Sequence, residues 1–280
     1  MADLISHANG LGFLTFVAAT NLLGTQYLLM YQNATAGLIF WVIGIASWLL
    51  ITYLVFTALI IKEDKPDLAH GINGAWLLAT VATQSVAILS TLVASYSTPS
   101  VRLELNFVAF SMWLWGGMQY IWMMAIIFYR YNFFRMDASD LTPPYWINMG
   151  AMAISTLAGS TLIEHPIEAP YLFSLLPFIK GFTIFYWATA TWWLPMLLIL
   201  VIWRHWYKRF PVQYDPLFWG AAFPLGMYTV STQQLNAAMQ FSFLDGLAKF
   251  MFAVSLITWG LTFFGTCKRC WLWCKFKCLA

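Results

Sequence analysis

The sequence predicts an all-α membrane protein with about eight transmembrane helices, arranged as four inner/outer helical hairpins around a central pore. Three observations lead to this class: the composition, the number of apolar runs, and a regular alternation in what the runs contain. Of the 280 residues, 61% are hydrophobic and 9% are charged, and the mean hydropathy is +0.71. Soluble domains carry about 25% charged residues, so we expect the chain to lie in a lipid bilayer.

The apolar runs follow one another with short connections. They cover approximately 10–31, 36–61, 72–94, 104–129, 143–163, 172–206, 216–236 and 244–266. Each run is long enough to cross a hydrocarbon core of about 30 Å. We therefore expect a transmembrane domain over residues 1–266 and a basic, Cys- and Trp-rich cytoplasmic tail over 267–280. The first residues lack the basic segment of a secretory signal, so the first run is expected to be retained as a span.

Positive charge indicates the orientation. The connections after even-numbered runs hold most of the basic residues, whereas the odd-numbered connections offer Arg102. Cytoplasmic loops carry an excess of Lys and Arg, so both termini are predicted to be cytoplasmic in a multi-pass protein of the plasma (cell inner) membrane. The basic residues on the predicted cytoplasmic side are Lys62, Lys65, Arg130, Arg135, Arg204, Lys208, Arg209, Lys268, Arg269, Lys275 and Lys277.

The odd-numbered runs are rich in small and polar residues, whereas the even-numbered runs are rich in large apolar residues. The fifth run, PPYWINMGAMAISTLAGSTL, begins with Pro143 and Pro144, which are tolerated in a first helical turn, and then presents Gly, Ala, Ser and Thr. The second run instead reads GLIFWVIGIASWLLITYLVFTALII. Unpaired polar groups are costly in hydrocarbon, so the odd-numbered runs are expected to share a wet or hydrogen-bonded axis while the even-numbered runs face lipid. The alternative is that the polar groups serve helix packing alone.

A hairpin repeat would explain this alternation. The dipeptide Thr-Gln recurs on three odd-numbered runs and is a faint sign of such a repeat. The three pairs are Thr25-Gln26, Thr83-Gln84 and Thr232-Gln233.

Charged residues cluster at the ends of the runs, so hydroxyls, amides and helix ends are the polar groups left to line a pore. Such linings suit small anions. Lys180 lies inside the sixth run, where it is predicted either to attract anions or to extend to the membrane surface. No basic stripe suits nucleic acid. The cysteines of CKRCWLWCKFKC lie on one helical face rather than around a turn, so we expect no metal and no cofactor.

Four segments carry a resemblance to a known family: PPYWINMGAMAISTLAG, GINGAWLLATVATQSVA, KGFTIFYWATATWWLP and WGAAFPLGMYTVSTQQL. They closely resemble the tellurite-resistance/C4-dicarboxylate transporter family, whose relatives include plant slow anion channels and fungal malate and sulfite transporters. The likeness extends from about His7 to Phe264. It implies a ring of helical hairpins, with inner helices around a pore for small anions and outer helices against lipid.

The resemblance also implies particular site residues. A phenylalanine on the last inner helix plugs the pore in this family, and the matching residue is Phe223, directly before the helix-kinking Pro224. Small anions of the C4-dicarboxylate, tellurite, sulfite or halide and nitrate class are the expected substrates, and a homotrimer is the expected assembly. Candidate lining residues are Thr20, Asn21, Thr80, Gln84, Asn148, Ser155 and Thr229.

One departure from the family keeps a second hypothesis open. The family has five hairpins, and the opening DLISHANGLGFLTFVAATNLLGTQ resembles the start of the second, so the first hairpin is expected to be absent. A non-conducting, truncated family member acting as a structural or regulatory membrane subunit is the alternative to an anion transporter. An enzyme or electron carrier is not expected, because the four histidines lie in loops or at helix ends and no paired carboxylates lie within a run.

Overall fold

The computed structural model describes residues 3–165 and 169–277, and its secondary structure there is helical, which confirms the all-α class. The predicted runs fall on eight long helices. Their bounds are α1 (Leu14–Tyr31), α2 (Ala34–Ile61), α4 (Leu78–Ser95), α5 (Pro99–Phe133), α6 (Ile147–Glu164), α7 (Pro170–Ile202), α8 (Trp219–Met239) and α9 (Asp245–Lys277), with a short α3 (Leu68–Gly71) between α2 and α4.

Six segments among the described residues are long and apolar enough to cross a membrane. They contain α1, α2, α4, α6, α7 and α9. Helices α5 and α8 are less hydropathic because Trp, Tyr, Gln and Gly interrupt their aliphatic residues. The number of spans is therefore six by hydropathy, and the eight spans of the sequence analysis stay a prediction.

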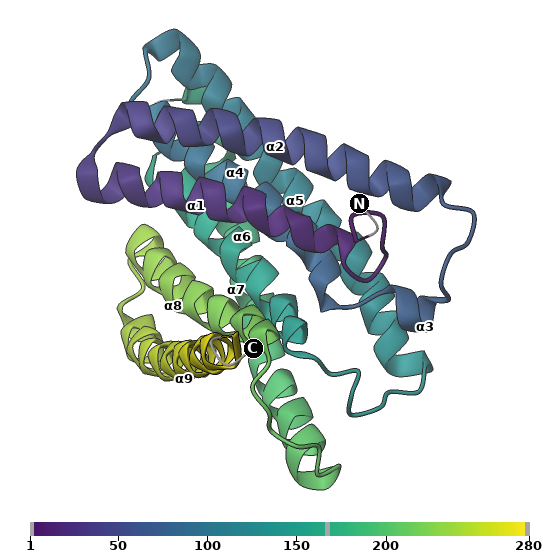
Figure 1. Cartoon of the computed structure of the whole chain (residues 1–280). Helices are drawn as coiled ribbons and strands as arrows, with labels where there is room; N and C mark the ends of the chain where they lie inside the picture. The colour runs from purple at the N-terminus through teal and green to yellow at the C-terminus, as the bar shows by residue number, and fades with distance from the viewer. Residues whose placement is uncertain (1–2, 166–168, 278–280) are drawn as a thin grey trace.

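The helices form hairpins of one inner and one outer member. The inner helices α1, α4, α6 and α8 pack against one another in that order, and each packs against the outer helix that follows it in the chain (Figure 1). Helices α4 and α6 are buried over about nine tenths of their apolar segments, whereas α2, α7 and α9 expose most of theirs. The first and last inner helices, α1 and α8, do not pack against each other.

The four inner helices begin with the same local structure. Each is preceded by a polar residue, Asn9, Asn73, Thr142 or Asp215, and opens with a 3₁₀ turn that runs straight into the α-helix. The side chains of Asn73 and Asp215 accept hydrogen bonds at 2.8 Å from the backbone N–H two residues on. The four turns are η1 (Gly10–Phe13), η2 (Gly74–Leu77), η3 (Pro143–Trp146) and η6 (Pro216–Phe218).

This shared start is a clearer repeat than the Thr-Gln pairs. Thr83 lies nearer the start of its helix than Thr25 and Thr232 do, so the three threonines do not occupy equivalent positions. The repeat is thus visible in how each inner helix begins, where the sequence reads NG, NG, TP and DP.

Tryptophans of the outer helices bond to the next inner helix along the chain. Trp48 of α2 donates its indole N–H to Thr83 Oγ1 of α4 at 2.9 Å, and Trp41 of α2 donates to Ser90 Oγ at 2.7 Å. Trp113 of α5 donates to the Ser155 carbonyl of α6 at 3.0 Å. Buried polar groups need such partners, so these bonds hold each hairpin to its successor.

The predicted tail does not form a separate element. Helix α9 continues without a break from Asp245 through Lys277, so the first eleven residues of the predicted tail, 267–277, extend the last outer helix. Cys267, Cys270 and Cys274 are exposed free thiols on this extension, and Cys278 lies outside the described residues.

Candidate functional site at the start of the inner helices

A cavity of about 680 Å³ lies where the four inner helices begin. All four contribute their first turns to it, so the helices run in the same direction away from it. The wall residues are Ala8, Asn9, Gly12, Thr15, Ala18, Ala19 and Leu22 from the first hairpin, Asn73, Ala75, Leu78 and Val81 from the second, Thr142, Pro144 and Ile147 from the third, and Pro216, Leu217, Trp219, Gly220 and Phe223 from the fourth.

The wall changes character along the helices. Asn9, Asn73 and Thr142 are the residues that precede the helical turns, so polar groups surround the cavity where the inner helices start. Further along the helices the wall is made of Leu22, Val81 and other apolar side chains. A solute that enters at the helix starts therefore meets hydrogen-bonding groups first and apolar side chains afterwards.

Phe223 forms part of this apolar region. Its side chain is half-buried and lines the cavity from the second turn of α8. The next residue, Pro224, is buried inside α8 and rests directly on α6: a Cβ built on Gly150 would lie 2.8 Å from both Cβ and Cγ of Pro224. The small residue at 150 thus lets α6 and α8 approach closely at the position of Phe223.

The seven predicted lining residues do not appear among the wall residues of this cavity, and three of them bond to neighbouring helices. Asn21 donates to Ser85 Oγ of α4 at 3.2 Å. Gln84 donates to the Trp113 carbonyl of α5 at 3.0 Å, and Asn148 donates to the hydroxyl of Tyr131, also of α5, at 2.8 Å. These amides hold inner helices to their neighbours, which is the packing alternative of the sequence analysis.

The other four are placed differently. Ser155 and Thr229 donate their hydroxyls to carbonyls of their own helices, Ala151 at 2.7 Å and Leu225 at 3.0 Å. Thr80 is fully buried and its Oγ1 has no hydrogen-bond partner among the described protein groups, while Thr20 is half-buried. A role of these residues in lining a pore stays a prediction.

Lys180 lies away from the cavity. It is exposed on the outer helix α7, between Ile179 and Gly181, and it is absent from the cavity wall. Lys180 is therefore not part of this cavity, and its attraction for anions stays a prediction.

Arg130 has a structural role that its place in the sequence does not reveal. Its guanidinium is buried at the end of α5, where Nη1 donates to the Ile72 carbonyl at 2.9 Å and to the Tyr145 hydroxyl at 2.6 Å. Asp140 lies 3.9 Å from Nη2. Arg130 thereby ties the outer helix to the starts of two inner helices and fixes two walls of the cavity. In the sequence it was one basic residue among eleven on its side of the membrane.

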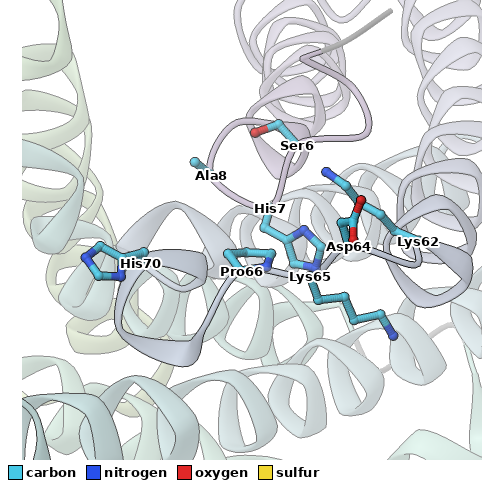
Figure 2. A pocket seen from close by; sticks show the side chains of 8 residues that line it. All are labelled: Ser6, His7, Ala8, Lys62, Asp64, Lys65, Pro66 and His70. Atoms are coloured by element: carbon cyan, nitrogen blue, oxygen red, sulfur yellow. The ribbon is translucent and has the colours of Figure 1, made fainter.

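A second cavity has a volume of about 410 Å³, and Figure 2 shows the side chains that line it. It is formed by the loop before α1 and the loop after α2, and Ala8 lines both cavities. His7 lies here with its ring facing Lys62 and Asp64, while His70 lies at the far end (Figure 2). Burial, followed by the charges of Lys62 and Lys65, lowers the pKa of His7 below its ordinary value.

The described residues contain no group of three or more His, Cys, Asp or Glu side chains placed to hold a metal ion. The main cavity offers the starts of four helices, amides and hydroxyls at its polar end, and an apolar wall further along the helices.

Comparisons with known proteins agree on the class of the chain. The family described as voltage-dependent anion channel matches residues 3–267. An uncharacterized membrane protein of Mycobacterium tuberculosis (strain ATCC 25618 / H37Rv) is 33% identical over 144 residues, which cover 51% of this chain and 73% of that protein. No solved structure gives a significant match.

Two uncharacterized transporters of Methanocaldococcus jannaschii are similar along most of the chain. One is 25% identical over 256 residues, covering 91% of this chain and 72% of the relative. The other is 24% identical over 270 residues, covering 96% and 75% respectively.

Proposed function

The chain belongs to the voltage-dependent anion channel family, and from that premise we propose that it moves small anions through a pathway that begins in the cavity at the starts of α1, α4, α6 and α8. Membership implies anion transport and points to a transporter rather than an enzyme. The substrate class we propose is that of C4-dicarboxylates, tellurite, sulfite, halides and nitrate.

The observation that supports this proposal is the convergence of four helix starts on one cavity. The start of a helix carries a partial positive charge that favours anions. Here this charge supports the proposal rather than free N–H groups, because the N–H groups of Ala75 and Leu217 already bond to Asn73 and Asp215, and the turn at Pro143 begins with two prolines. Polar side chains at the same end add further groups, namely the hydroxyl of Thr142 and the amides of Asn9 and Asn73, which also donate at 3.4 Å to Asp3 and to the Ala8 carbonyl. An anion can exchange water for these groups without meeting a fixed cation that would hold it tightly.

Phe223 is proposed as the gate of this pathway, with Pro224 as the element that positions it. Pro224 cannot donate a backbone hydrogen bond within α8, and its ring is held against Gly150. Beyond Phe223, Thr80 is the strongest of the predicted lining residues, because its hydroxyl is buried and lacks a protein partner.

Placement in the membrane is proposed on charge. The ends of α2, α5 and α7 carry Lys62, Arg135 and Lys208 on the side where the inner helices start, and we assign this side to the cytoplasm of a plasma (cell inner) membrane. The anion would then enter the cavity from the cytoplasm. A homotrimer is the proposed assembly.

The proposal is tested by anion flux into liposomes that contain the purified 280-residue chain. Chloride, nitrate, sulfite and malate are compared for wild type, Phe223→Ala and the matched control Phe250→Ala, which removes an exposed ring from the outer helix α9. Flux that rises in Phe223→Ala and is unchanged in Phe250→Ala supports the gate. Equal flux in all three proteins would show that Phe223 does not limit passage.

One observation favours the alternative of a non-conducting subunit. Helices α1 and α8 border the cavity but do not pack against each other, so this chain alone does not close the ring of inner helices. Absence of flux for every anion in both wild type and Phe223→Ala, with normal membrane insertion, would favour this alternative.

A further inference from the structure

A separate apolar groove runs between α7, α8 and α9. It has a volume of about 300 Å³, and its walls include Leu197, Leu200 and Val201 of α7, Leu225 of α8 and Val254 of α9. The segment that leads into α6 closes one side with Leu141, Thr142, Pro143, Tyr145 and Trp146. The groove exists because α7 and α9, both fully within the described residues over this length, do not pack against each other. Leu198 and Val201 line the groove and are exposed on the outer helix α7, so an acyl chain in the bilayer can reach it from that side.

One end of the groove carries a cation that is incompletely paired. Arg204 donates from Nη1 to the Leu141 carbonyl, and its guanidinium carbon lies 4.4 Å from the centre of the Phe210 ring. Its Nε is buried and has no hydrogen-bond partner among the described protein groups. Asp215 is the carboxylate whose charge acts on Arg204, but that carboxylate already accepts a hydrogen bond from the Leu217 backbone N–H.

The residues that follow α7 place this end of the groove at a membrane surface. Trp206 and Tyr207 are 79% and 76% exposed, as expected of aromatic residues at the level of lipid headgroups. Lys208 lies beside them with its Nζ 5.5 Å from the centre of the Trp203 ring, and Arg209 is also exposed. Basic side chains at this level attract anionic lipids.

We propose that this groove binds one anionic phospholipid, with its phosphate at Arg204 and one acyl chain along Leu197, Val201 and Val254. His205 and Thr142 line the same end and offer further hydrogen-bonding groups to the headgroup. A lipid fits better than a protein segment, because the groove joins an apolar channel open to the bilayer with a cation at headgroup level. The site shares only Thr142 with the walls of the anion cavity, and it does not depend on the proposed transport.

The test is lipid binding to the purified full chain, measured by native mass spectrometry during titration with phosphatidylglycerol and, separately, phosphatidylcholine. Wild type is expected to bind one phosphatidylglycerol in preference to phosphatidylcholine. Arg204→Gln is expected to weaken phosphatidylglycerol binding about fivefold, the typical effect of one basic residue at a membrane surface. The control Arg135→Gln removes a side chain that is 89% exposed at the end of α5 and should bind like wild type.

A second pair of variants tests the groove itself and does not depend on the folding of Arg204→Gln. Val201→Trp fills the groove and should lose the bound lipid, whereas Ile202→Trp adds the same ring at the next, exposed position outside the groove and should keep it. Equal lipid binding by these two variants would overturn the proposal. So would binding of inorganic phosphate that is as tight as that of the lipid, because it would show that the acyl chain contributes nothing.

Discussion

The contact between Gly150 and Pro224 gives a prediction whose size follows from the structure. In Gly150→Ala the new methyl group would lie 2.8 Å from two atoms of the Pro224 ring and 3.1 Å from Pro224 Cα. A proline ring and its backbone cannot rotate away, so α6 and α8 must separate. Overpacking of this kind costs about 1–3 kcal/mol.

A matched glycine isolates this cost. Gly226 lies on α8 shortly after Pro224, and a Cβ built there meets no atom within 4 Å. Replacing glycine by alanine inside a helix gains up to about 1 kcal/mol from helix propensity, and this gain is common to both variants. The difference in unfolding free energy between Gly150→Ala and Gly226→Ala therefore reports the overpacking, and we expect Gly150→Ala to be the less stable by about 1–3 kcal/mol.

The assay is reversible unfolding in mixed detergent micelles, followed by far-ultraviolet circular dichroism. Anion flux measured on the same proteins adds a functional readout, because separation of α6 and α8 moves Pro224 and with it Phe223. We expect flux to change in Gly150→Ala and to stay at the wild-type level in Gly226→Ala. Equal stability and equal flux in the two variants would refute the close approach of the helices and the positioning role of Pro224.

Three further predictions concern other contacts. Arg130→Gln should lower the unfolding free energy by about 2–4 kcal/mol in the same assay, because two hydrogen bonds from a buried charged group are lost; a loss below about 0.5 kcal/mol would show that the guanidinium does not tie the helix starts together. Trp48→Phe should lower the unfolding free energy by about 1 kcal/mol, because the hydrogen bond from its indole N–H to Thr83 of the next hairpin is lost; an unchanged midpoint of the unfolding transition would contradict that role. The folded-state pKa of His7 is lowered below 6.5, so the folded protein binds a proton less readily than the unfolded chain and stability should fall as the pH drops below that value; His7→Gln should show a smaller fall, and an identical pH profile would disprove the shift.

Much of the architecture could be predicted from the sequence because the bilayer imposes it. A polar or small-residue run has to be covered by other helices, and α4 and α6 are indeed the most buried spans. The start of α6 was recognisable from Pro143 and Pro144, which open the 3₁₀ turn that leads into the helix. Such local rules are sufficient to predict which segments form helices and which of them are inner or outer.

The partners of individual polar groups could not be predicted in the same way. Periodicity places Thr80 and Gln84 on one stripe of α4, but it does not say which neighbour that stripe meets. The structure pairs Gln84 with a carbonyl of α5 and leaves the Thr80 hydroxyl without a protein partner. The wall of the cavity is instead built from the first turns of the helices, where Asn9, Asn73 and Thr142 give only the ordinary signals of helix capping in the sequence.

The common direction of the inner helices has an electrical consequence. Each helix carries a macrodipole equivalent to about half a positive charge at its start and half a negative charge at its end. Four parallel helices therefore place a total of about two elementary positive charges around one mouth of the pathway and the opposite charge around the other. The outer helices run the other way, but they lie farther from the axis and compensate only in part. An anion on the proposed pathway would thus experience an asymmetric potential, and inward and outward currents measured at equal and opposite voltages should differ in size.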